Sequence, residues 1–326
     1  MIVLMEPVAS QLERMEAGDH GLPRWFAAPL AAAASGDFAF SRSLPSLLRS
    51  GWLGKAAEPA LVFNVGPLEA ALALLPTRLR LACLYQWPPP EQLGTAKRFI
   101  YKRLLAKSEL ILAYSRATQA ELVRRFPGTP VRWIGLFTDT EFFGPARSQA
   151  PPEDFILCPG DHLRIEPVVS FLARELGVRV VRFSTSPAVA AYHRENPNPY
   201  VECLSGIPFS KVRDLYKSAR LVLNAADDRY WPVGITTFCE ALAMDKLIVT
   251  SGGHSCSGYE FEDGSKPYFT VRNCYDQREW LGAVRLALCG AKSSADGQSP
   301  RDLALRLCSF DATMAGWKAA LEILDR

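Results

Sequence analysis

Residues 221–264 read LVLNAADDRYWPVGITTFCEALAMDKLIVTSGGHSCSGYEFEDG, and this stretch decides the fold. It contains two short, nearly continuously apolar runs, 221–224 and 247–250. Between them, residues 235–244 form an apolar, helix-like segment that follows a glycine, Gly234. Apolar runs of this length, joined through a helix, are typical of parallel strands that helices cover on both faces. The stretch therefore predicts a strand–helix–strand unit of a parallel α/β sheet.

The same alternation extends over two segments of the chain. In the first segment the predicted strands are 2–5, 61–65, 79–85, 110–113 and 131–134. In the second they are 155–158, 178–183, 200–204, 221–224, 247–250 and 268–271, and helices are predicted at 167–176, 209–218 and 235–244. We therefore expect two Rossmann-like domains.

A stretch rich in Gly, Pro and small polar residues, 143–152, separates the two segments and is typical of a linker. We place the domain boundary near residue 148, between an N-terminal domain, 1–147, and a C-terminal domain, 148–326. A second such stretch, 290–300, indicates an exposed loop. After it, residues 310–324 have the apolar spacing of a closing amphipathic helix. The 326 residues suffice for two domains that each bury a core.

The composition, 48% hydrophobic and 22% charged, is that of a globular protein. No apolar run is long enough to cross a bilayer, and the start lacks the features of a signal peptide, so we expect a cytoplasmic protein. The eight cysteines include no CxxC pair, and the four histidines have no metal-ligand spacing. These patterns favour reduced core thiols over a disulfide framework, and they predict no metal site.

The net charge of +3 is unevenly distributed. Residues 1–147 hold 17 Lys and Arg against 12 Asp and Glu, whereas the remainder holds 20 against 22. This excess is too small to indicate a nucleic-acid partner. Five bases lie at near-helical spacing among apolar residues: Lys97, Arg98, Lys102, Arg103 and Lys107. Such a helix either contacts an anionic membrane or faces the core with a solvated polar side.

The start of the helix after Gly234 has the features of an anion site. Backbone N–H groups at a helix N-terminus hold phosphate oxygens, helped by the helix dipole. The groups involved would belong to Gly234, Ile235, Thr236 and Thr237, and the two threonines add hydroxyl donors. Glu240 projects from a mostly apolar helix, where a carboxylate requires donors such as a ribose diol. The alternative is a helix led by glycine whose Glu240 pairs with a nearby base.

The order of these parts resembles the donor-binding half of retaining GT-B glycosyltransferases, especially glycosyltransferase family 4. Members carry a Glu-Ala-hydrophobic-Ala helix, then a strand, a Gly-Gly pair and an acidic-Gly turn. Here these are Glu240-Ala241-Leu242-Ala243, residues 247–250, Gly252-Gly253 and Glu262-Asp263-Gly264. Upstream, the turn Gly206-Ile207-Pro208 and the strand that ends at Gly160 are also similar. The resemblance covers roughly the last two thirds of the chain.

The resemblance implies an α/β, GT-B fold with two Rossmann-like domains facing across a cleft, and a last helix, about 310–325, that packs back toward the N-terminal domain. It also implies transfer of a sugar from a nucleotide-diphosphate sugar, UDP- or GDP-linked, with retention of configuration and without a metal. The nucleotide sugar is the donor substrate, and no further cofactor is expected. The acceptor is unidentified: a glycan, a lipid-linked glycan, a small molecule or a protein.

The resemblance also assigns roles to individual residues. Arg164 is the base close to Gly160 and would contact the diphosphate by charge-assisted hydrogen bonds. Gly160, Ile207 and the helix start from Gly234 to Thr237 would bind the donor. Glu240 would hold the ribose.

The sequence departs from the family pattern at three places. The first of the family's two glutamates is replaced by Pro232, so that Asp227 or Asp228 would take the acidic role near the sugar. Gln86 stands where the first domain often has a histidine, and residues 6–10 replace a Gly-rich loop. Two alternatives stay open, and the departures support the second. One is a nucleotide-sugar epimerase on the same fold, and the other is a GT-B-like partner protein without turnover.

Overall fold

The computed structural model describes residues 2–4, 23, 39–41, 59–62, 74, 80–85, 93–145, 153–290 and 297–324. The chain divides into two compact units. Among the described residues, the second unit consists of Pro23 and of the segment from Leu136 to Phe310. The first unit consists of the other residues up to Gly135 and of those from Asp311 onward. The predicted boundary near residue 148 lies outside the described residues and stays a prediction.

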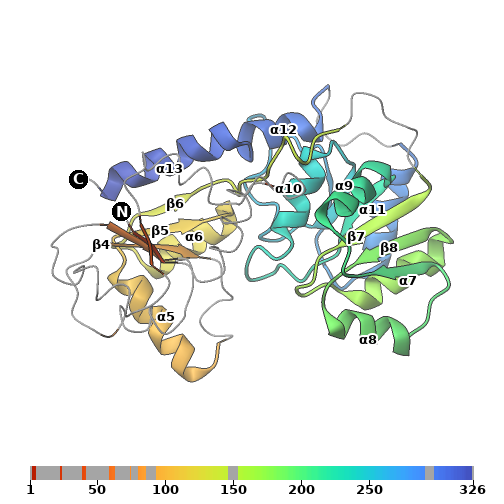
Figure 1. Ribbon diagram of the computed structural model, residues 1–326, viewed down its shortest axis with the longest axis horizontal. Helices are drawn as coiled ribbons and strands as arrows, with labels where there is room; N and C mark the ends of the chain where they lie inside the picture. Colours follow the sequence, from red (N-terminus) through yellow and green to blue (C-terminus); the bar gives the residue numbers. More distant parts are fainter. Residues whose placement is uncertain are drawn as a thin grey trace. The chain divides into compact units, whose positions relative to one another are not determined.

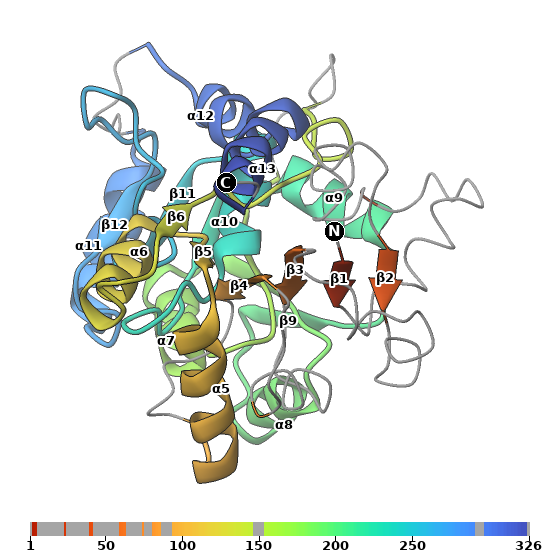
Figure 2. The same ribbon diagram turned by 90° about the vertical axis from the view of Figure 1, so that its left-hand side faces the viewer.

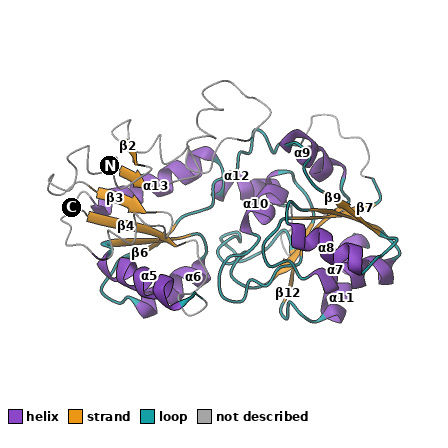
Figure 3. Cartoon of the chain, turned by 60° about the horizontal axis from the view of Figure 1, so that its bottom comes forward, coloured by secondary structure: helices purple, strands orange, loops and turns teal. Residues whose placement is uncertain are grey.

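The first unit contains a six-stranded parallel sheet of order β2-β1-β3-β4-β5-β6, which Figure 2 shows strand by strand. Its strands are β1 (Ile2–Leu4), β2 (Ala39–Ser41), β3 (Pro59–Val62), β4 (Arg80–Tyr85), β5 (Leu110–Ala113) and β6 (Val131–Trp133). Helices α5 (Thr95–Lys107) and α6 (Arg116–Arg125) lie on one side of the sheet, and α13 (Phe310–Leu324) lies on the other (Figures 1 and 3).

The second unit contains another six-stranded parallel sheet, of order β9-β8-β7-β10-β11-β12. Its strands are β7 (Phe155–Pro159), β8 (Arg179–Phe183), β9 (Val201–Leu204), β10 (Leu221–Asn224), β11 (Ile248–Ser251) and β12 (Phe269–Val271). Numbered along the chain, this order is 3-2-1-4-5-6, the Rossmann arrangement, and it reverses between β7 and β10. The carboxyl ends of these two strands therefore flank the place where ligands of such sheets bind.

Six helices of the described chain belong to the second unit: α7 (Glu166–Leu176), α8 (Pro187–Glu195), α9 (Phe209–Ser218), α10 (Ile235–Ala243), α11 (Gln277–Leu288) and α12 (Pro300–Leu307). Alternate residues of β7 and β10, such as Ile156 and Leu223, pack with α7 and α11 in one apolar cluster. The intervening residues, such as Leu157 and Val222, are also fully buried. The central strands are thus covered on both faces, which explains their continuous apolar runs.

All eleven predicted strands are present with shifts of at most three residues at their ends, and the helices 209–218 and 310–324 are confirmed. The prediction did not name β2 or the helices α6, α8, α11 and α12. Residues 39–41 are a strand of only three residues, whose apolar run is too short to predict it. The edge strand β9 is partly exposed. It is therefore not covered on both faces, as the central strands are.

The eight cysteines are free thiols. Six are buried, as expected for core thiols, whereas Cys203 and Cys289 are exposed. Cys203 lies on the edge strand β9, and Cys289 follows the last turn of α11. At these positions no other element of the described chain covers the side chain, so the two thiols are not buried as we expected from their apolar neighbours.

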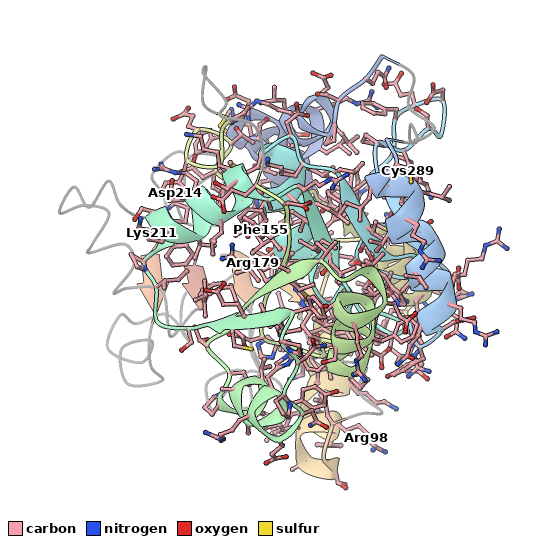
Figure 4. The ribbon with its side chains drawn as sticks, turned by 90° about the vertical axis from the view of Figure 1, so that its right-hand side faces the viewer. Arg98, Phe155, Arg179, Lys211, Asp214 and Cys289 are labelled. Carbon is pink, nitrogen blue, oxygen red and sulfur yellow. The ribbon has the colours of Figure 1, made fainter. Side chains whose placement is uncertain are left out.

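A buried ionic network underlies the end of β7. The Arg182 guanidinium, 0% exposed, donates to the Glu166 carboxylate at 2.7 Å, and His193 Nε2 lies 2.8 Å from the other oxygen of that carboxylate. Arg182 Nη1 also donates to the carbonyl oxygens of Cys158 and Phe183 at 3.1 and 2.7 Å. Arg182 thereby fixes the last residues of β7 and β8. At the start of β8, Arg179 instead lies over the Phe155 ring, 5.3 Å from its centroid (Figure 4).

The stabilisation that this network provides depends on pH through the Glu166 carboxyl. Burial alone would raise the pKa of its carboxyl, but hydrogen bonds from His193 and Arg182 outweigh burial and hold the pKa at about 2. Because this pKa lies below the unfolded-state value, the stabilisation is present above about pH 4.5 and is lost as pH falls toward 2.

We expect the free energy of unfolding to fall by about 3 kcal/mol through this group between pH 5 and 2. Glu166→Gln should be destabilised at neutral pH by about 3–5 kcal/mol, because Arg182 loses its counter-charge. The same variant should show a flatter acid limb in urea unfolding measured across this pH range. Glu175→Gln, an exposed change on the same helix, should keep the wild-type profile. Identical acid limbs for both variants would contradict the assignment.

Candidate functional site

The loops that follow β7 and β10 lie side by side at the carboxyl end of the second sheet. Arg164 and Ala226 form an antiparallel bridge between them. The Ile165 amide donates to the Ala225 carbonyl at 3.0 Å, and the Asp227 amide donates to the Leu163 carbonyl at 2.9 Å. This pairing covers the point where the strand order reverses. The candidate site is therefore built on backbone hydrogen bonds between two loops.

The first loop turns sharply between the strand and α7. Gly160 has φ +105°, and Leu163 has φ +47°, which is uncommon for a residue with a side chain. A Cβ atom on Gly160 would overlap the Arg164 guanidinium, because Arg164 folds back over this glycine. A residue other than glycine would thus both strain the backbone and displace Arg164.

The Arg164 guanidinium is held from two sides. Its Nε donates to the Pro159 carbonyl at 2.8 Å, and its Nη2 donates to the Thr237 hydroxyl at 2.8 Å. Its Nη1 is buried and has no hydrogen-bond partner among the described residues. Nor does any ion pair of the described chain involve Arg164. Arg164 therefore presents a positive charge with an unused donor.

The helix α10 begins beside this guanidinium. Gly234, with φ +81°, is its N-cap residue, and no side chain caps the helix. A Cβ atom on Gly234 would overlap the Asn224 amide and crowd Arg164 Nη1. The Asn224 side chain, 0% exposed, donates to the Thr250 hydroxyl at 3.0 Å, while its Oδ1 has no partner among the described residues. A helix N-terminus without a side-chain cap and a guanidinium with one unused nitrogen thus meet in one place, which is a favourable arrangement for an anion.

Glu240 lies one and a half turns into α10 and accepts a hydrogen bond of 2.7 Å from the Tyr216 hydroxyl. Burial raises the pKa of the Glu240 carboxyl to about 7, although Tyr216 and the Arg164 charge act in the opposite direction. The Tyr216 side chain is itself fully buried and comes from α9. Glu240 is consequently a carboxyl group that changes its charge near neutral pH.

Asp228 holds the glycine loop that follows β11. Its side chain is 1% exposed, and its Oδ2 accepts from the Ser255 amide and hydroxyl at 3.0 and 2.6 Å. A Cβ atom on Gly253 would overlap the Asp228 carboxylate, so the glycine permits this close approach. Through these contacts Asp228 holds the loop that contains Gly253 and Ser255 in place.

The neighbouring Asp227 differs from Asp228 in its exposure and partners. Its carboxylate accepts from Arg229 Nε at 2.8 Å and from the Tyr275 hydroxyl at 2.7 Å. These contacts, the Arg229 hydrogen bonds first and burial in opposition, lower the pKa of the carboxyl. Asp227 is therefore an ionised side chain within an exposed cluster.

The structure brings together Gly160, Arg164, Gly234 and Thr237, four of the residues singled out in the sequence. Ile235 is buried and Thr236 is exposed, so the two threonines differ: only Thr237 contacts Arg164. Ile207 lies partly buried in the loop between β9 and α9. Gln86 and residues 6–10 lie outside the described residues, so the predictions that involve them stay untested.

Three residues of the site were not singled out in the sequence: Asn224, Tyr216 and Ser255. Asn224 had a usable signal, since a polar residue that ends a continuously apolar strand requires hydrogen-bond partners once it is buried. Tyr216 and Ser255 could not be recognised from a local pattern in the sequence. Their partners, Glu240 and Asp228, lie 24 and 27 residues away along the chain.

No protein-family model matches the sequence, and no curated protein matches it. The structure is nevertheless similar to several solved glycosyltransferases. Sucrose-phosphate synthase from Thermosynechococcus elongatus matches with a TM-score of 0.70 and 14% identity, over 86% of this chain and 76% of that one. HepE from Anabaena in complex with UDP matches with a TM-score of 0.69 and 13% identity, over 98% and 99%. A glycosyltransferase from Rickettsia africae matches with a TM-score of 0.65 and 11% identity, over 100% and 98%.

These similarities define the class of the fold: the chain has the α/β fold of the GT-B glycosyltransferases. At these identities the likeness concerns the fold. Within the described residues, no group of three or more His, Cys, Asp or Glu side chains is arranged to hold a metal ion. No helix of the described chain has the length and apolar character of a membrane span.

The Glu240 carboxyl gives a pH prediction opposite in sign to that for Glu166. Its folded-state pKa lies above the unfolded value of 4.5, so stability is full below about pH 4.5 and falls as pH rises through 7. We expect a loss of about 3 kcal/mol through this group between pH 4.5 and 8. Glu240→Gln should remove this loss in chemical unfolding series, and the exposed control Glu322→Gln should retain it. A wild-type profile in Glu240→Gln would refute the raised pKa.

Proposed function

We propose that this protein transfers a sugar from a nucleotide-diphosphate sugar, UDP- or GDP-linked, to an acceptor. The observation that carries the proposal is the buried Arg164 guanidinium, whose Nη1 has no partner among the described residues, beside the uncapped N-terminus of α10. Two linked phosphates present several acceptor oxygens and a negative charge to such a place. The diphosphate would complete the hydrogen bonding of Arg164 and of the helix amides.

The charges around the site favour the same ligand. Glu166 and Arg182 form a buried ion pair, so they compensate each other. Glu240, with its pKa of about 7, supplies less than a full negative charge at neutral pH. Arg164 therefore retains part of its charge uncompensated, and burying an uncompensated charge is costly. A bound diphosphate would relieve that cost.

The roles of the remaining residues follow from this arrangement. Gly160 and Gly234 leave the space in which Arg164 and the phosphates meet, and Thr237 orients the guanidinium. The Glu240 carboxylate would accept hydrogen bonds from the ribose, and Ile207 would contact the base. Asp228 would act through the 252–255 loop, bringing backbone amides toward the sugar, rather than by touching the sugar itself.

During transfer, negative charge develops on the leaving diphosphate. Arg164 and the α10 amides would stabilise that charge from fixed positions, which is the largest electrostatic requirement of the reaction. With this clamp the reaction would not need a divalent metal. Retention of configuration is part of the proposal, as the family resemblance implies it. The UDP bound by Anabaena HepE, which shares the fold, supports a uridine-linked donor here.

Donor binding gives the first test. In thermal or chemical unfolding with UDP-, GDP-, ADP- and dTDP-sugars, we expect one donor class to stabilise the protein by about 2.7 kcal/mol at 100 times its Kd. Arg164→Ala should weaken binding of that donor about 100-fold, the equivalent of one lost charge-assisted contact of about 2–3 kcal/mol. Arg174→Ala, an exposed change on α7, should bind as the wild type does. Equal affinities for both variants would remove Arg164 from the site.

Slow hydrolysis of the bound donor gives the second test, since it needs no known acceptor. We expect the first sugar detected by proton NMR to have the anomeric configuration of the donor, and EDTA to leave the rate unchanged. Release of the opposite anomer would contradict retention, and loss of activity in EDTA would contradict metal independence. Conversion of the donor into an isomeric nucleotide sugar would favour an epimerase. Tight binding without any product would favour a partner protein without turnover.

A further inference from the structure

One side of α5 carries a stripe of exposed residues, Phe99, Lys102, Arg103 and Ala106, which we call the outer stripe. Their spacing of three, four and seven residues places them on a single helix face. Phe99 is 58% exposed, which is high for an aromatic side chain in a helix that packs on a sheet. The outer stripe therefore combines an exposed aromatic ring with two neighbouring cations.

The opposite side of α5 fixes the direction in which the outer stripe points. Tyr101, Leu104 and Leu105 are 0–1% exposed and belong to the apolar cluster that includes β4. The Tyr101 ring stacks on Tyr85 of that strand, with 5.6 Å between their centroids. Since the inner face is buried in the core, the helix cannot turn to hide Phe99.

The charge of α5 has a single sign. Residues 94–108 contain five Lys and Arg and no Asp or Glu. Arg98 lies in the first half of the helix (Figure 4), and its Nη2 donates to the Leu93 carbonyl at 3.3 Å. Exposed charges of one sign on a surface attract a surface of the opposite sign.

We propose that the outer stripe docks the protein on the surface of an anionic lipid bilayer. Lys102 and Arg103 would lie at the level of the headgroups, and the Phe99 ring would enter the boundary between headgroups and acyl chains. An anionic polymer would use the cations but would gain nothing from burying Phe99 in hydrocarbon. The joint presence of an exposed ring and cations on one fixed face favours a bilayer. The proposal does not depend on the nature of the donor or on turnover.

The first arm of the test measures sedimentation with vesicles of phosphatidylcholine, with and without phosphatidylglycerol. The wild type should sediment only with the vesicles that contain phosphatidylglycerol, and less at high salt. Lys102→Gln/Arg103→Gln should lower the partition coefficient about 25-fold, at about fivefold per basic residue. The matched control, Arg278→Gln/Arg285→Gln, removes two exposed cations from α11 and should bind as the wild type does. An equal loss in both double variants, or no binding by the wild type, would overturn the proposal.

The second arm separates a bilayer from a purely electrostatic anion surface. Phe99→Ala should lower partitioning about tenfold, since a largely exposed ring loses its burial in the bilayer. Leu286→Ala is the matched control, because Leu286 is 57% exposed on α11. Unchanged partitioning of Phe99→Ala would show that the ring does not enter the bilayer and would refute the docking mode. Thermal unfolding and donor binding of each variant, measured without vesicles, should match the wild type, so this result is independent of the proposed transfer reaction.

Discussion

The guanidinium of Arg164 is the group around which the second unit organises its candidate site. It joins the end of β7 to the helix α10 through the Pro159 carbonyl and the Thr237 hydroxyl. Both glycines that border it, Gly160 and Gly234, have positive φ angles, and neither has room for a Cβ atom. The two glycines lie 74 residues apart in the sequence. Their backbone conformation and their lack of a side chain together leave the space that this one buried cation occupies.

Around this cation, two glutamates show how differently the same side chain can be used. Glu166 is saturated with donors from Arg182 and His193, and its charge is fixed down to about pH 2. Glu240 has one neutral donor, Tyr216, and burial brings its pKa to about 7. The first carboxylate is part of the scaffold, and the second is the one that the proposed function assigns to the ribose. A shifted pKa alone would not separate these roles, whereas the number of donors around each carboxylate does.

Much of this fold was predictable because continuously apolar strands and helices with one apolar face have distinct periods. The segment from Leu221 to Ala243 shows both in succession, and the structure has a strand and a helix there. Gly160, Arg164 and Gly234 could be singled out because glycines before a helix and a nearby base have a clear chemical meaning. The part that escaped prediction depends on distant contacts. No local pattern indicates that Tyr216 donates to Glu240, or that Asp228 holds Ser255.

The terminal helix α13 belongs to the first unit, although the chain reaches it only after completing the second. Its buried residues Trp317, Ala320 and Leu324 thus supply one side of a core whose sheet was synthesised some 180 residues earlier. During translation, the second unit has all its strands before the first has its last helix. The second unit is thus complete in sequence before the first, so it can fold before residues 310–324 have been synthesised, whereas the first unit requires that helix.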